Sequence, residues 1–227
     1  MSKVFIHQPD FCPWLNFFMR AKHSDYFVVL DNVQFNRRGW FNRDLIKTKS
    51  GAYKITIPIK KEPRDSLLIK NVKFSNYDDW KTVFFKTLEV NYSKSKFFHE
   101  NILILNNLFN EDFVYLIDLN IKLINYFFSI FSIKTKLIFS SELRLSSYKN
   151  KLIVDICNKL NCKEYITGKG SDDYLDLDEF KKNNISLNQD VNFNDKYLQI
   201  NGTFMRDLSV LDFYFNCYDK KNKTNII

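Results

Sequence analysis

The sequence predicts an α/β protein with a Rossmann-like, mostly parallel sheet, flanked by helices and interrupted by a helical insertion in the middle of the chain. Two apolar runs at 4–6 and 27–30 enclose a helical segment at 14–22, and such a strand-helix-strand order within thirty residues is typical of a βαβ unit. Short strands and helices alternate again over 136–187. The 227 residues include only five glycines and four prolines, too few for the many turns of an all-β sandwich.

The first elements are short strands that end in polar residues. The strand at 4–6 is expected to end before Pro9, because proline lacks the backbone N–H that a sheet requires. The helix at 14–22 leads to the strand at 27–30, which ends at Asp31. Two further strands are expected after the polar loop that follows, at 53–59 and 67–73.

The middle of the chain has the spacing of helices. We expect a helical insertion at about 75–133, where apolar residues recur every three or four positions from Val114 to Phe131. The strands expected after it are at 136–139, 164–167 and 185–187, and the helices are at 150–160, 177–183 and 208–215. The sequence therefore predicts a single α/β domain at 1–219, with a frayed tail at 220–227.

Charge bounds the class of partner. The chain has 34 basic and 26 acidic side chains, a net charge of +8 and a pI near 9.1. Such a balance indicates either a solvated basic surface or an anionic partner such as a nucleotide or a phosphosugar. The basic residues are scattered and form no run of five, so no nucleic-acid partner is expected.

Cysteine spacing and hydropathy indicate a cytoplasmic protein. The four cysteines have no CxxC spacing and no histidine follows them at zinc-finger spacing, so we expect reduced thiols and no metal site. The first residues do not resemble a signal peptide. The most apolar stretch, 113–133, contains Asp118 and Lys122, so no membrane span is expected. Both a monomer and a homodimer remain open.

Polar side chains follow three of the expected strands, where ligands bind in open parallel sheets. His7 is a candidate acid or base, and the alternative is a histidine that orients the turn at Pro9. Asp31 is a candidate catalytic or ribose-binding carboxylate, and the alternative is a turn-forming aspartate. His7 and Asp31 are therefore the predicted catalytic residues.

The loop at 34–43 has the densest set of functional side chains. Arginine offers a planar fork of donors that suits phosphate or carboxylate, and a tryptophan face can stack on a base or a sugar. The alternative is an ordinary exposed loop. The substrate-binding candidates here and at the end of the first strand are Gln8, Gln34, Arg37, Arg38, Trp40, Asn42 and Arg43.

A glycine pair follows the strand at 164–167. Gly168 and Gly170 are too close together for a P-loop, but they would let backbone N–H groups approach an anion. The alternative is a tight turn. Thr167, Gly168, Gly170 and Tyr174 complete the predicted substrate-binding set.

Four segments together resemble one family, and they span nearly the whole chain. The opening Ile6–Trp14, with its "QP-x-F-x-P" pattern, and the segment Asp31–Arg43 resemble the first two blocks of WbqC-like proteins. Thr167–Leu175 and Leu208–Asp212 are similar to the third and fourth blocks. The resemblance implies a bacterial protein of surface-polysaccharide (O-antigen) gene clusters.

Three functions fit these residues. The first is a transferase that moves an acyl or aminoacyl group onto a nucleotide-linked amino sugar, with acyl-CoA or an ATP-activated acyl group as donor. The second is a nucleotidyltransferase-like enzyme that uses a nucleoside triphosphate and a divalent ion, although the H-x-G-H signature is absent. The third is a non-catalytic protein that binds a nucleotide sugar or carbohydrate.

Overall fold

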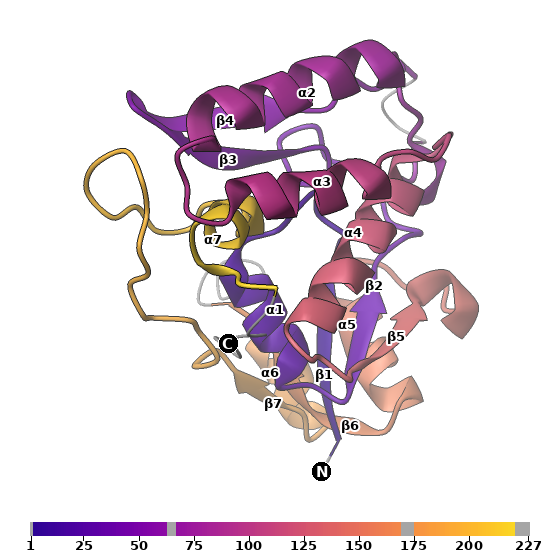
Figure 1. Cartoon of the computed structure of the whole chain (residues 1–227). Coiled ribbons are helices and arrows are strands. Elements are labelled where there is room, and N and C mark those ends of the chain that lie inside the picture. Colours follow the sequence, from indigo (N-terminus) through magenta and orange to yellow (C-terminus); the bar gives the residue numbers. More distant parts are fainter. Residues whose placement is uncertain (1, 63–66, 169–174, 221–227) are drawn as a thin grey trace.

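A computed structural model gives the fold of residues 2–62, 67–168 and 175–220, and its centre is a five-stranded sheet (Figure 1). All neighbouring strands of this sheet are parallel, in the order β5-β2-β1-β6-β7. The strands are β1 (Ser2–His7), β2 (Tyr26–Val29), β5 (Lys136–Phe139), β6 (Cys162–Ile166) and β7 (Ser186–Asn188).

The strand order confirms the predicted Rossmann-like fold. The chain builds outward from β1 through β2 to β5, then returns to the other side of β1 to add β6 and β7. The order therefore reverses between β1 and β6. In open α/β sheets, ligands bind beyond the carboxyl ends of the strands at such a switch point.

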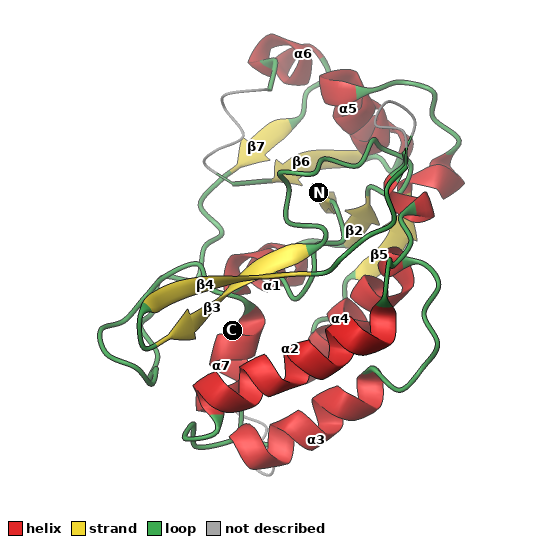
Figure 2. Cartoon of the chain, turned by 90° about the horizontal axis from the view of Figure 1, so that it is seen from above, coloured by secondary structure: helices red, strands yellow, loops and turns green. Residues whose placement is uncertain are grey.

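Helices cover both faces of the sheet, as Figure 2 shows. Side chains of β1 alternate between two apolar clusters: Phe5 packs with the helices of one face, and Val4 and Ile6 pack with those of the other. The first face carries α1 (Leu15–Lys22), α4 (Leu116–Ile130) and α7 (Val210–Cys217), and the second carries α5 (Lys149–Lys159) and α6 (Leu177–Lys182).

A hairpin and two more helices lie on the α1 side of the molecule (Figures 1 and 2). They belong to the same apolar cluster as α1 and α4. Asn76 caps the longest helix by accepting a hydrogen bond from Asp79 N. The elements are β3 (Arg43–Thr48), β4 (Gly51–Thr56), α2 (Tyr77–Tyr92) and α3 (Phe98–Leu108).

The structure differs from the sequence-based elements in two regions. The strand expected at 67–73 is a 3₁₀ helix, η1 (Ile69–Asn71), with an isolated bridge on either side, between Gln34 and Leu68 and between Lys73 and Tyr115. The strand expected at 53–59 belongs to the separate β3–β4 hairpin. The sequence analysis predicted neither β3, the first strand of this hairpin, nor the helix α3. A second 3₁₀ helix, η2 (Ser140–Leu143), follows β5.

Residues 189–209 connect β7 to α7 without a helix or strand. The segment is anchored at several points along its length. Lys47 of β3 donates to Gln199 Oε1 and to the carbonyl of Thr203, and Ser209 Oγ donates to Cys12 O. These bonds hold the segment against the end of β3 and against the turn that precedes α1.

Candidate functional site

His7 is the last residue of β1 and lies at the switch point of the sheet. Its ring stacks on Phe5 and meets Trp14 and Phe17 edge-on, with ring centroids 5.5 to 5.8 Å apart. Its Nδ1 lies 2.9 Å from the carbonyl of Gln8. A carbonyl only accepts, so Nδ1 carries the proton and donates, and Nε2 keeps its lone pair.

The surroundings of His7 favour the neutral ring. Burial lowers its pKa to about 4, and the positive charge of Arg20 lowers it further, although the hydrogen bond to Gln8 opposes both. The side chain is still 30% exposed, so solvent and a ligand can reach the ring. At neutral pH, His7 is therefore an uncharged base whose Nε2 has no hydrogen-bond partner among the described residues.

Asp10 is a nearby acid that the sequence did not single out. Its Oδ2 lies 3.6 Å from His7 Nδ1, and the residue is only 2% exposed. Burial raises its pKa to about 8. The signal that could have found it is its place in the turn directly after β1, where Asp10 N donates to Gln8 O.

Asp31, the second predicted catalytic residue, is held by the fold. It follows the adjacent strand β2 and is 4% exposed. Its Oδ1 accepts hydrogen bonds from Ser140 Oγ and Ser141 N, both at 2.9 Å. These bonds join the end of β2 to the start of η2, so this oxygen is already occupied.

The loop at 34–43 packs directly against the residues that follow β1. Phe11 N donates to Trp40 O at 3.2 Å, and Asn120 Nδ2 of α4 donates to both Pro9 O and Phe41 O. A β-carbon at Gly39 would lie 3.9 Å from the side-chain oxygen of Gln8. The structure thus brings the predicted residues of these two segments together.

The predicted binding residues of this loop fall into two groups. Asn42 donates to Ile57 O, and Arg43 Nη2 donates to Arg37 O at 2.6 Å, so both side chains hold the loop in place. Arg37 and Arg38 are exposed, and neither has an ion-pair partner in the part of the chain that the structure describes.

An open cleft of about 590 Å³ lies beside the two exposed arginines. Trp40, in the same loop, is 39% exposed. The cleft can therefore offer positive charge to an anionic ligand, with an aromatic ring in the same loop. Its lining residues are Gln34, Phe35, Asn36, Arg37, Arg38, Glu62 and Leu67.

The end of β6 lies on the other side of the switch point. Thr167 is buried and its N donates to Asn188 O of β7. Gly168 lies against Arg20 of α1, because a β-carbon there would come within 2.9 Å of Nη1. Gly170 and Tyr174, also predicted to bind substrate, lie outside the described residues.

Arg20 was not expected from the sequence, where it reads as one more basic residue of a surface helix. It is 8% exposed, and its Nη2 donates to Asn192 Oδ1 at 2.9 Å. Its charge acts on His7, and its guanidinium contacts Gly168. Arg20 thus connects the ends of β1 and β6.

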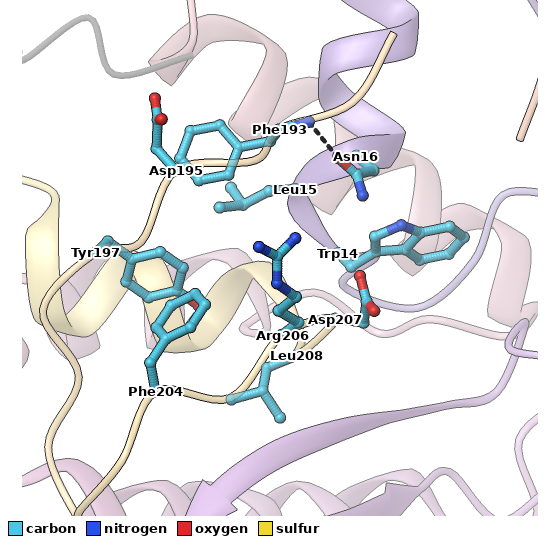
Figure 3. Close-up of a pocket in the computed structure, with 10 residues that line it drawn as sticks. All are labelled: Trp14, Leu15, Asn16, Phe193, Asp195, Tyr197, Phe204, Arg206, Asp207 and Leu208. Carbon is cyan, nitrogen blue, oxygen red and sulfur yellow. Dashed lines mark hydrogen bonds between the residues drawn. The ribbon is translucent and has the colours of Figure 1, made fainter. Parts of the chain in front are cut away.

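A second, smaller pocket lies beside Trp14 (Figure 3). Aromatic rings of the 189–209 segment line it, and the Arg206 guanidinium points into it. The Asn16 side chain accepts a hydrogen bond from Phe193 N at its edge. Its volume of about 30 Å³ holds one or two waters, so this conformation has no room for a sugar.

Within the described residues, no group of three or more His, Cys, Asp and Glu side chains is arranged to hold a metal ion. The four cysteines form no disulfide. Among the helices that the structure describes, none has the length and apolar character needed to cross a bilayer.

Comparison with known proteins agrees with the resemblance of the four segments. The model of the WbqC-like protein family matches residues 8–224. The uncharacterized protein Rv1507c of Mycobacterium tuberculosis is 30% identical over 218 residues, which cover 95% of this chain and 94% of that protein. No solved structure matches the chain. With the match to the family model extending over nearly its whole length, the chain belongs to the WbqC-like protein family.

Proposed function

We propose that this chain is a transferase of bacterial surface-polysaccharide (O-antigen) biosynthesis, which moves an acyl or aminoacyl group onto the amine of a nucleotide-linked sugar. The observation that supports the proposal most directly is the state of His7. Its Nδ1–H donates to Gln8 O, so Nε2 is left to accept a proton from a substrate at the switch point. The polysaccharide context rests on the resemblance to WbqC-like proteins.

The reaction needs a base for the following reason. The sugar amine attacks the carbonyl carbon of the acyl donor, which is a thioester such as acyl-CoA or an ATP-activated acyl group. A C–N bond forms, the C–S or C–O bond of the donor breaks, and the N–H proton passes to His7 Nε2. The proton then leaves with the departing thiolate or phosphate. A positioned base contributes about 10²–10⁴-fold to such a step.

The nucleotide sugar is assigned to the cleft beside the loop at 34–43. Arg37 and Arg38 are exposed there and their charge matches a diphosphate. Trp40 offers a ring for a base or a sugar, and Gln8 lies between this loop and His7. Thr167 and Gly168 lie at the opposite side of the switch point, where the acyl donor is proposed to bind.

The test is an incubation of the protein with a panel of nucleotide amino sugars and activated acyl donors, followed by mass spectrometry. We expect an acyl mass increment on the sugar and loss of its free amine, with product formed about 10²–10⁴-fold more slowly by the His7→Gln protein. Tight sugar binding by calorimetry with no product from any donor would contradict the proposal and favour a binding protein. Pyrophosphate release from a nucleoside triphosphate and a divalent ion would instead favour nucleotidyl transfer.

A further inference from the structure

We infer that Asp10, rather than Asp31, is the acidic partner of His7, and that the two side chains hold one proton between them at the switch point of the sheet. Asp10 is then a positioning residue, which acts on substrate only through the imidazole. This inference rests on the proposed function for its consequence in turnover, but its proton equilibrium can be measured without any substrate.

The geometry sets the pair apart from other acids near the site. Asp10 Oδ2 lies 3.6 Å from His7 Nδ1, whereas the proposed base is the other ring nitrogen, Nε2. Among the described residues, His7 is the only side chain recorded in hydrogen-bond or ion-pair contact with this carboxyl. Asp31 in contrast is bound by Ser140 and Ser141.

Burial disfavours the charged form of both members of the pair. Removing a carboxylate from water without hydrogen bonds is costly, so Asp10 keeps a proton up to a pKa of about 8. Burial and the charge of Arg20 on α1 lower the pKa of His7 to about 4, so its ring stays neutral above that pH. Asp44 of β3 lies close enough for its charge and that of Asp10 to repel.

Among the described residues, the groups around the pair add no further charge that would move these two pKa values. The buried thiol of Cys12 is also close to Asp44, and burial raises its pKa, so it adds no charge. Between about pH 4 and pH 8 the His7–Asp10 pair therefore holds a single proton. With Nδ1 and Oδ2 3.6 Å apart, a charge on either group acts on the other, so we treat the titration as that of the pair.

The pair makes a definite prediction for a base mechanism. When Asp10 is protonated, a proton from the substrate would give the pair two protons, a state reached only near pH 4. When Asp10 is ionised, the same proton creates an imidazolium beside a carboxylate, which stabilises it. Turnover should therefore rise about tenfold per pH unit as the pH approaches 8 from below.

The direct test is an NMR titration of the ring protons of the three histidines in the wild-type protein and in Asp10→Asn. The His7 signals are assigned from their loss in His7→Gln. We expect the wild-type His7 signals to shift with a midpoint near pH 8, and this step to vanish in Asp10→Asn. The signals of His23, whose Nδ1 is bonded to Met19 O on an exposed helix end, should be the same in both proteins and serve as an internal control.

A wild-type His7 signal that shows no step between pH 7 and pH 9 would overturn the inference, and this result does not depend on the folding of any variant. A step that persists in Asp10→Asn would overturn it as well. If transfer is observed, a rate independent of pH from 6 to 9 would remove Asp10 from the mechanism while leaving the transferase. If no transfer is found, the NMR step still establishes the pair.

Discussion

The carboxyl ends of β1 and β2 lie side by side in the sheet, yet their polar residues are in opposite states. Asp31 follows β2 and accepts hydrogen bonds from Ser140 Oγ and Ser141 N. His7 ends β1, and within the described part of the chain only its Nδ1 has a hydrogen-bond partner. Position at a strand end is therefore not enough for chemistry, because a reactive atom must also remain outside the hydrogen bonds of the fold.

The arginines of the loop at 34–43 show the same contrast. Arg43 donates to Arg37 O and to the Asn42 side chain, and so it holds the loop. Arg38 has no ion-pair partner among the described residues, and its backbone N alone is tied, to Asn36 Oδ1. The two residues have the same charge and lie five positions apart, but only Arg38 is available to a ligand.

The largest effect is expected from His7→Gln. This change removes the free Nε2 while keeping a side chain of similar length, so turnover should fall about 10²–10⁴-fold with little change in melting temperature. Initial rates by mass spectrometry and thermal unfolding measure the two quantities. His23→Gln is the matched control, because His23 is exposed at the end of α1. Equal losses of turnover for both variants would show that the histidine at the end of β1 is not the base.

The next effect concerns the two arginines. Arg38→Ala should weaken nucleotide-sugar binding by about 1.5–3 kcal/mol, the range of hydrogen bonds to charged groups, and leave stability unchanged. Arg43→Ala should have the opposite pattern. It should lower the melting temperature, because the carbonyl of Arg37 loses its donor, and change nucleotide-sugar binding less than Arg38→Ala does. Calorimetry and thermal unfolding of both variants decide. A lower melting temperature for Arg38→Ala with unchanged affinity would make it a structural residue.

Asp31 should affect stability more than chemistry. Asp31→Ala leaves Ser141 N without its acceptor, which costs about 1 kcal/mol in the free energy of unfolding, whereas Ser140 Oγ can still donate to Asn32 Oδ1. Urea unfolding of Asp31→Ala, Ser140→Ala and the double variant gives the coupling between the two residues. Additive losses would show that the hydrogen bond contributes nothing, and a turnover loss in folded Asp31→Ala as large as that of His7→Gln would restore Asp31 as a base.

The local sequence was sufficient for the central strands β1 and β2 because each contains a short apolar run that is buried on both faces. It failed for β3, where Asp44 and Lys47 interrupt the pattern although both are buried. Lys47 is tolerated there because Gln199 Oε1 and Thr203 O, more than 150 positions away, accept hydrogen bonds from its ammonium group. No local pattern reports a partner at that distance.

The candidate site was predictable in the same uneven way. His7 and the loop at 34–43 were found because strand ends and arginine clusters are visible in a sequence. Asp10 and Arg20 were missed, since their importance comes from burial beside His7, which depends on how α1 and the turn after β1 pack. Burial also decides the protonation state, and so the chemistry, of both His7 and Asp10.

The smallest effect tests the link between the ends of β1 and β6. Gly168→Ala places a β-carbon 2.9 Å from Arg20 Nη1, the far end of a flexible side chain, so the guanidinium should move aside at a cost within about 1 kcal/mol. Because the Arg20 charge lowers the pKa of His7, its displacement should raise that pKa. Arg20→Met removes the same charge and should raise it at least as far. Adding Gly168→Ala to Arg20→Met should then change the His7 titration no further, whereas an additive shift would mean that Gly168 acts on His7 by another route.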